Sequence, residues 1–245
     1  SEMCIRDRSY RYTYKNYCKR KRKHNRNKIG GIYMEYIIIA MIAYLIGSIN
    51  FSILISKKKA GYDIRKKGSG NAGTTNMLRN LGKKYAAITL VCDILKGVVA
   101  IAIAIVVGNI LKDTNKALLV QIAAIAVVIG HTFPVFFGFK GGKGVATSLG
   151  ILLMTNWQLG LICLVFALVL MALTRMVSLG SIAAAILFPV LTLFVGEGHY
   201  IVESTGIGNG YFVYSVVLAI IVLFNHRENI KRILNGSENK LSFKK

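Results

Sequence analysis

Two separate stretches of the chain combine glycine, hydroxyl or amide side chains and positive charge. The first, KKGSGNAGTTNMLRNLGKK, runs from Lys66 to Lys84. Glycines let successive backbone N–H groups curl around an anion, and an arginine can fork onto a phosphate. A flexible basic loop that only sets membrane topology is the competing explanation, but lysines alone would serve that purpose. We therefore expect a phosphate site with donors from Ser69, Gly70, Asn71, Thr75, Asn76 and Arg79.

The same stretch also spells GxGxxG, with glycines at positions 68, 70 and 73. A dinucleotide-binding fold needs an apolar strand immediately before that pattern and a βαβ unit around it. The preceding residues here are GYDIRKK, which do not form such a strand. The pattern therefore does not predict a dinucleotide site.

The second stretch, FKGGKG, covers Phe139–Gly144 and leads directly into an apolar segment. It is one residue shorter than a P-loop, and Gly144 stands where a Ser or Thr would hold magnesium, so we expect no nucleotide. Lysines beside a helix N-terminus do make an anion site. The candidates are Lys140, Gly141, Gly142, Lys143 and Thr147, whereas His131, a little earlier, is more often a structural residue.

Near the C-terminus, His226 and Asn229 are three residues apart and share one face of a helix. The sequence that follows, IKRILNGSENK, predicts a short amphipathic helix at the membrane surface. A histidine there can titrate or donate to a phosphate, or the charges can simply lie at the interface. Ser178 and Ser181 begin an earlier apolar segment, where serines usually bond the backbone or a neighbouring helix.

Hydrophobic residues make up 54% of the 245 residues, only 17% are charged, and the mean hydropathy is +0.52. Such a composition predicts an all-α integral membrane protein with several spans. The apolar runs are Tyr36–Ser56, Ala86–Ile110, Ala117–Phe139, Val145–Met154, Leu159–Leu173, Val177–Val195 and Tyr211–Asn225. The region from Val145 to Leu173 is either one long helix or two short ones joined at residues 155–158. Within the second run, Asp93 and Lys96 either serve a function or neutralise each other.

The distribution of charge favours seven transmembrane helices over six. From Met34 onward there are 21 Lys and Arg, and a seven-span topology puts 18 of them on one side of the membrane. The positive-inside rule makes that side cytoplasmic, with the N-terminus outside and the C-terminus cytoplasmic. A net charge of +22 can indicate nucleic-acid binding, but here the charge lies in short runs between apolar spans, so we expect no nucleic acid.

Residues 1–33 differ from the rest, with eleven Lys or Arg and little apolar periodicity. The hexapeptide MCIRDR resembles the translation of a sequencing-library adapter, so we expect residues 1–33 to be adapter and upstream read-through. A signal sequence would need an apolar core and a cleavage site, which this segment lacks; a genuine basic arm is the other possibility. We therefore expect a non-native or disordered extension over 1–33 and one membrane domain over 34–245.

Five ordered blocks of the chain resemble the bacterial acyl-phosphate:glycerol-3-phosphate acyltransferases, the PlsY family. The blocks are GSGNAGTTNMLRNLGKK, CDILKG, GHTFPVFFGFKGGKGVAT, TRMVSLGS and HRENIKRILNGSE. The resemblance implies a seven-span enzyme of the bacterial inner membrane with its active site facing the cytoplasm. It implies acyl transfer from acyl phosphate to the 1-hydroxyl of glycerol 3-phosphate, giving lysophosphatidic acid and phosphate. Acyl-CoA and acyl carrier protein would not be direct donors, and we expect a monomer in the lipid bilayer with no cofactor and no metal.

The resemblance also implies which residues form the site. The family's three cytoplasmic motifs map onto Gly68–Arg79, Lys140–Thr147 and His226–Glu238. We expect Lys143, His226 and Asn229 to act in catalysis, and Glu238 with Ser178 or Ser181 to help hold the substrates. The proton acceptor is either His226 or the phosphate of the substrate itself.

Three other activities deserve comparison. The HxxxxD motif of other glycerolipid acyltransferases is absent, because Phe136, Ser204 and Lys231 stand at the fifth positions after the histidines at 131, 199 and 226. A carrier for an organic phosphate would place its binding groups near the bilayer midplane between related halves, and neither feature is evident. A phosphatase acting on acyl phosphate would use the same loops, and the sequence alone does not separate it from a transferase.

Overall fold

The computed structural model describes residues 34–111, 114–194 and 208–241. The chain divides into two units, Ser1–Ile38 and Ile39–Lys245. The described part of the first unit, residues 34–38, is helical and begins an apolar helix that ends at residue 48. The basic segment 1–33, for which we predicted an extension foreign to the domain, lies outside the described residues.

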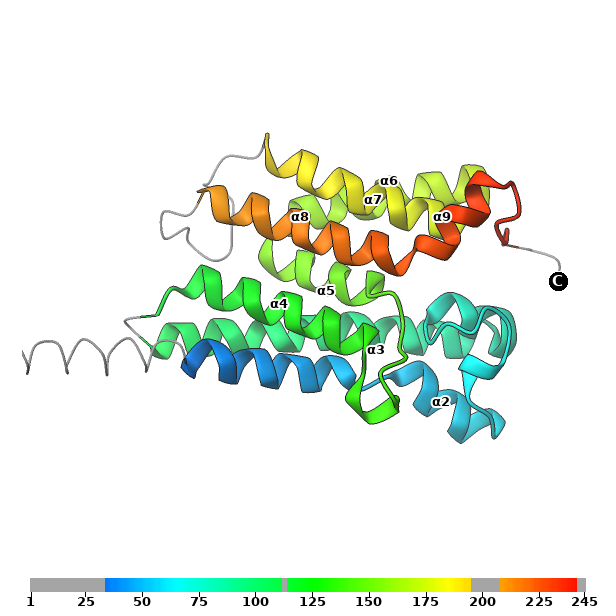
Figure 1. Ribbon diagram of the computed structural model, residues 1–245, viewed down its shortest axis with the longest axis horizontal. Helices are drawn as coiled ribbons and strands as arrows, with labels where there is room; N and C mark the ends of the chain where they lie inside the picture. Colours follow the sequence, from blue (N-terminus) through cyan, green and yellow to red (C-terminus); the bar gives the residue numbers. More distant parts are fainter. Residues whose placement is uncertain (1–33, 112–113, 195–207, 242–245) are drawn as a thin grey trace, which may run out of the picture. The chain divides into compact units, whose positions relative to one another are not determined.

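Helices account for all the regular secondary structure in the described ranges, which confirms the all-α prediction. Figure 1 labels most of them along the chain. After the first helix come α2 (Phe51–Ala60), α3 (Thr74–Ile110), α4 (Lys116–Thr132), α5 (Val145–Thr155), α6 (Trp157–Thr174), α7 (Val177–Thr192), α8 (Gly208–Asn225) and α9 (Arg227–Leu234). Short 3-10 turns, η1 (Ile64–Lys66) and η2 (Val135–Phe137), lie in the first loop (residues 61–73, before α3) and the second loop (residues 133–144, before α5), which carry the glycine-rich stretches.

Four of the described helical segments are long and apolar enough to cross a membrane. They are Met34–Ala60, Thr74–Ile110, Lys116–Phe137 and Trp157–Thr174, and the pair α8–α9, bent by 64°, would make a fifth. The apolar helices α5 and α7 are shorter, with 11 and 16 residues. At 1.5 Å per residue, α5 extends only about 17 Å, against roughly 30 Å for the hydrocarbon core.

Two helix boundaries differ from the hydropathy-based prediction, and an alternative left open by the sequence is decided. The first helix stops at residue 48, and α2 begins after Asn50, whose Oδ1 accepts from Ile53 N at 3.2 Å. Helix α3 begins at Thr74, well before the predicted start at Ala86. Its first turns are polar, so a prediction based on hydropathy does not detect them. A non-helical Gly82 (φ 83°) breaks α3. Between Val145 and Leu173 the chain forms two helices, since Asn156 ends α5 and caps α6.

Small residues let α3 and α5 approach closely, as is common between membrane helices. A Cβ on Gly97 of α3 would lie 2.5 Å from Thr147 O, and one on Gly150 of α5 would lie 2.1 Å from Ile94 O. Helix α5 also contacts α4 and α6, and α4 contacts α8 (Figure 1). This packing brings the loop before α5 beside the loop before α3.

Candidate functional site

Asn76 organises the first glycine-rich loop. Its side-chain NH₂ donates to three backbone carbonyls of the loop, those of Ile64, Lys67 and Asn71, at 3.0–3.1 Å. Its Oδ1 accepts from Ser69 N at 3.1 Å and Asn80 Nδ2 at 2.9 Å. The buried Asn76 amide is therefore fully used by the loop itself, whereas the neighbouring Ser69 and Gly70 are exposed to solvent.

The second loop lies directly against the first. Gly141 N donates to Thr132 O at 2.9 Å, and Gly142 N donates to His131 O at 3.1 Å. Ala72 N of the first loop donates to Gly141 O at 3.4 Å. Gly141 and Gly142 are candidates for the anion site, and in this structure their backbone amides hold the loop. A Cβ on Gly142 would lie 2.0 Å from His131 Nε2, so that position requires the close approach that glycine permits.

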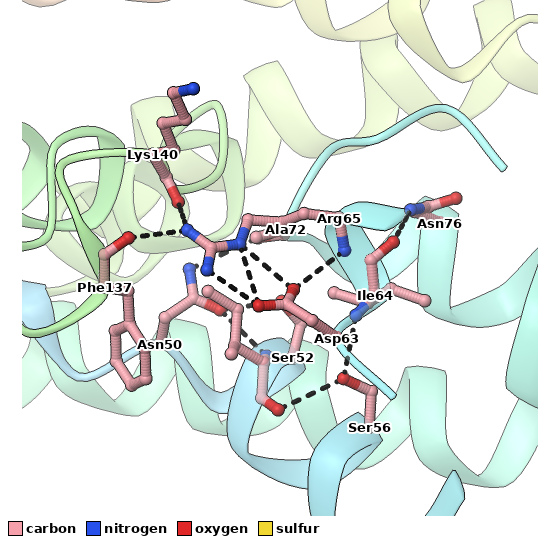
Figure 2. A network of polar contacts seen from close by, with 11 residues as sticks. Asn50, Ser52, Ser56, Asp63, Ile64, Arg65, Ala72, Asn76, Phe137 and Lys140 are labelled. Carbon is pink, nitrogen blue, oxygen red and sulfur yellow. Dashed lines mark hydrogen bonds and ion pairs between the residues drawn. The ribbon is translucent and has the colours of Figure 1, made fainter. Parts of the chain in front are cut away.

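Arg65 links the two loops and was missed by the sequence reasoning. It donates to backbone carbonyls of the second loop while Asp63 accepts from the same guanidinium (Figure 2). The signal that could have found it is Asp63, two residues earlier and one of only ten acidic residues in the chain.

Two helices begin at these loops without a side-chain cap. Gly73 precedes α3 and Gly144 precedes α5, and neither helix start receives a side-chain hydrogen bond. Uncapped first-turn N–H groups and the helix dipole favour a bound anion. Thr75 lies in the first turn of α3. In the first turn of α5, Thr147 is fully buried and its Oγ1 has no hydrogen-bond partner within the described residues.

The C-terminal segment brings the third expected stretch to the same place. Lys143 Nζ donates to Asn229 Oδ1, and Asn229 Nδ2 donates to Glu238 Oε1 at 2.8 Å. Ser178 Oγ donates to the same Glu238 oxygen at 2.9 Å, and Arg232 Nε donates to its other oxygen at 2.9 Å. The second loop, α7 and the tail thus meet in one continuous network.

The tail also contacts α3 and the start of α7. Arg79 Nη2 donates to Asn239 O at 3.2 Å, and Leu241 N donates to Arg175 O at 2.7 Å. Arg79, from the first loop's motif, is thereby placed beside the segment that carries Glu238. Residues from all three expected motifs are therefore neighbours, although they are distant in the sequence.

The electrostatics of this network favour an anion. Burial, and then the positive charges of Arg232 and Arg79, lower the pKa of Lys143 to about 8, against the opposing effect of Glu238. Burial works to raise the pKa of Glu238, but hydrogen bonds from Arg232, Asn229 and Ser178 outweigh it, so its pKa is lowered. Glu238 is therefore ionised at neutral pH, and it is one carboxylate among three cations. A doubly charged phosphate would relieve their mutual repulsion.

His226 lies at the junction of α8 and α9 and is buried. Its Nδ1 is 2.8 Å from Val222 O. Because a carbonyl oxygen can only accept, Nδ1 carries the proton, and Nε2 of the neutral ring keeps its lone pair. The preceding Asn225 donates to Thr132 Oγ1 at 3.1 Å and to Lys143 O at 3.4 Å, which ties this junction to the second loop.

Ser181 and Lys140 are among the expected residues whose side chains do not join the network. Ser181 Oγ donates to Val177 O of its own helix at 3.0 Å, so of the two serines only Ser178 contacts the tail. The side chain of Lys140 is exposed, and its carbonyl rather than its ammonium makes the contact with the first loop.

Asp93 and Lys96 do pair, with Nζ 2.9 Å from Asp93 Oδ1, and both are buried. Lys96 Nζ also donates to Gly47 O and Ile49 O at 3.2 Å and lies 2.6 Å from His131 Nδ1. The ammonium thus joins α3, α4 and the break after the first helix. The sequence indicated the pair but not its contact with His131.

The chain matches the sequence profile of the glycerol-3-phosphate acyltransferase family over residues 37–236. It is 43% identical over 211 residues to a glycerol-3-phosphate acyltransferase from Clostridioides difficile (strain 630), covering 86% of this chain and 98% of the relative. A Thermoanaerobacter sp. (strain X514) protein of the same name is 44% identical over 211 residues, with the same coverage.

Crystal structures of PlsY, an integral membrane glycerol 3-phosphate acyltransferase, share the fold. The glycerol 3-phosphate form superimposes with a TM-score of 0.73 and 36% identity, covering 84% of this chain and 96% of that one. The lysophosphatidic acid form gives a TM-score of 0.70 and 34% identity, covering 84% and 95%. The profile match extends over most of the chain and the relatives are matched almost end to end. The chain therefore belongs to the glycerol-3-phosphate acyltransferase family.

Proposed function

We propose that this protein transfers a fatty acyl group from acyl phosphate to the 1-hydroxyl of glycerol 3-phosphate, releasing lysophosphatidic acid and inorganic phosphate. The main support is the convergence of Arg79, Lys143 and Arg232 with two uncapped helix N-termini. Such an arrangement suits two phosphate groups, and both substrates carry one. Relatives solved in glycerol 3-phosphate and lysophosphatidic acid forms support the same acceptor and product.

In the proposed reaction the glycerol oxygen attacks the acyl carbon, an ester bond forms, and the bond from the acyl carbon to the phosphate oxygen breaks. Lys143 and the first-turn amides of α5 hold one phosphate, while Ser69, Asn71 and Arg79 hold the other. Their positive charge stabilises the phosphate as it leaves. Because acyl phosphate is already activated, alignment of the two substrates supplies much of the rate enhancement.

The hydroxyl proton leaves to His226 Nε2 or to a phosphate oxygen of the substrate. The hydrogen bond from His226 Nδ1 to Val222 O favours a neutral ring with Nε2 as acceptor, which supports the first route. Asn229, fixed by Lys143 and Glu238, orients the glycerol hydroxyls. Asn76, Gly141 and Gly142 shape the loops rather than contact the substrates.

We further propose seven spans, with the N-terminus outside and the loops of the site in the cytoplasm of a bacterial cell. Seven apolar helical segments and the 18 basic residues on one side support this topology. The acyl chain would lie between apolar helices, and the enzyme would act as a monomer without acyl-CoA or acyl carrier protein as donor.

The proposal is tested with the full chain purified in lipid, supplied with palmitoyl phosphate and labelled glycerol 3-phosphate. We expect labelled lysophosphatidic acid, and we expect Lys143→Ala to abolish it while the protein stays folded. Lys83→Ala is the matched control, because Lys83 is an exposed lysine outside the network. Absence of product from the wild-type protein would refute the proposal, and bound but unreacted glycerol 3-phosphate would then indicate a carrier.

A further inference from the structure

Arg65 makes contacts that connect the two loops without any substrate. Its Nη1 donates to Phe137 O at 2.6 Å and to Lys140 O at 2.8 Å. Its Nε and Nη2 donate to the Asp63 carboxylate at 2.7–3.2 Å. Figure 2 shows the guanidinium between the carboxylate and the two carbonyls, with the Lys140 side chain pointing away from it. Four of its five N–H donors are thus occupied by the protein.

The two carbonyls that Arg65 holds lie on either side of an unusual backbone. Gly138 and Phe139 both have positive φ, 66° and 57°, a conformation that residues other than glycine rarely adopt. Only Phe139 and Arg175 do so among the non-glycine residues that the structure describes. Such a conformation persists where its surroundings over-determine it, and the Arg65 contacts at residues 137 and 140 are part of those surroundings.

Asp63 fixes the guanidinium from the opposite side. Its Oδ1 also accepts from Arg65 N at 3.0 Å and caps the short turn η1. The hydrogen bond from the Arg65 side chain is the main cause that lowers the pKa of Asp63, so the pair stays ionised at neutral pH. Both side chains are largely shielded, with 23% and 12% of their surface exposed.

We infer that Arg65, held by Asp63, is a positioning residue that keeps the second loop, and with it Lys143, in register with the phosphate-binding first loop. This inference rests on the proposed function for its kinetic consequence but not for its structural one. A direct role in binding phosphate is a poor fit, because the guanidinium is directed at backbone carbonyls and a carboxylate.

The test compares Arg65→Ala, Arg65→Lys and Lys66→Ala in the full chain in lipid. Lys66 is the matched control, since its exposed side chain makes no hydrogen bond or ion pair within the described part of the chain. We expect Lys66→Ala to retain activity. Arg65→Ala should lower kcat by about 10- to 100-fold, with less than about a threefold change in KM for glycerol 3-phosphate, because small misalignments of reacting groups are costly. Arg65→Lys should also lose activity, since a single ammonium cannot span both carbonyls and the carboxylate.

Chemical rescue separates positioning from a merely structural role. Millimolar guanidinium should restore part of kcat in Arg65→Ala by occupying the vacated place beside Asp63, and should not do so in Asp63→Asn/Arg65→Ala. Unchanged kcat in both Arg65 variants, or a rise in KM alone, would overturn the inference. Should Arg65→Ala fail to fold, the kcat of Arg65→Lys decides.

Hydrogen exchange gives a readout that does not depend on activity. The Gly141 and Gly142 amides should exchange faster in Arg65→Lys than in the wild type or Lys66→Ala. Unchanged exchange would contradict the inference even in an active enzyme. If the wild-type protein makes no lysophosphatidic acid, the proposed function fails, whereas the exchange measurement still decides the role of Arg65.

Discussion

Lys143 should set the upper pH limit of the enzyme. Its pKa is lowered to about 8 by burial and by the charges of Arg232 and Arg79. The ammonium is therefore protonated and able to bind phosphate below pH 8, and it loses its charge as the pH rises further. Replacing it with arginine, which stays charged at every accessible pH, should remove this limit.

The size of the effect follows from the bond that is lost. A hydrogen bond to a charged group contributes about 1.5–3 kcal/mol. Since about 1.4 kcal/mol corresponds to a factor of ten, kcat/KM for glycerol 3-phosphate should fall about 10- to 150-fold between neutral pH and the alkaline plateau. The pH dependence of kcat/KM reports groups of the free enzyme, so the midpoint should lie near the Lys143 pKa of about 8.

The assay is lysophosphatidic acid formation between pH 6 and about 10, measured at low glycerol 3-phosphate for the wild type and Lys143→Arg. The arginine variant should be less active at neutral pH, because its larger head group must fit beside Asn229, but it should show no decline around pH 8. A decline with the same midpoint in both proteins would assign the limit to another group and refute this reasoning.

Two further predictions concern the framework of the site. Lys96→Met should lower the free energy of unfolding by about 3–5 kcal/mol, because it leaves Asp93 buried without its cation. Adding Asp93→Asn should recover part of that loss. Denaturation in detergent measures the stability of both variants, and equal stability of the single and double variants would argue against the pair. Gly142→Ala should reduce kcat at least about tenfold, because its Cβ would lie 2.0 Å from His131 Nε2 and 2.7 Å from Ala72 O. Gly138→Ala is the comparison, since its Cβ meets nothing within 4 Å and only its left-handed φ opposes the change, by about 1–2 kcal/mol; similar kcat losses in both would contradict the steric explanation.

The sequence was most informative where residue type alone determines behaviour. Long apolar runs identified the helices, and the glycine-plus-cation stretches with the His226–Asn229 pair identified segments that the structure brings together through Lys143, Asn229 and Glu238. The two-helix alternative at Asn156 is confirmed. The polar side chain of Asn156 interrupts the apolar run and caps the start of the new helix.

Tertiary partners were beyond the reach of sequence patterns. Nothing in the sequence showed that the backbone carbonyls of Thr132 and His131 would accept hydrogen bonds from the Gly141 and Gly142 amides. Those bonds depend on how α4 ends beside the second loop. The sequence presents Arg65 as one more basic residue, because the carbonyls that it contacts are more than seventy positions away. The hydropathy-based prediction did not find the start of α3 at Thr74, because the first turns of that helix are polar.

The most direct test of the proposed acyl transfer is the stoichiometry of its two products. The full chain in lipid would receive palmitoyl phosphate and glycerol 3-phosphate, without CoA, acyl carrier protein or magnesium, and both products would be quantified in the same sample. The proposed reaction predicts equal amounts of lysophosphatidic acid and inorganic phosphate, and no lysophosphatidic acid when palmitoyl-CoA replaces palmitoyl phosphate. Phosphate released without lysophosphatidic acid would contradict it and identify a hydrolase.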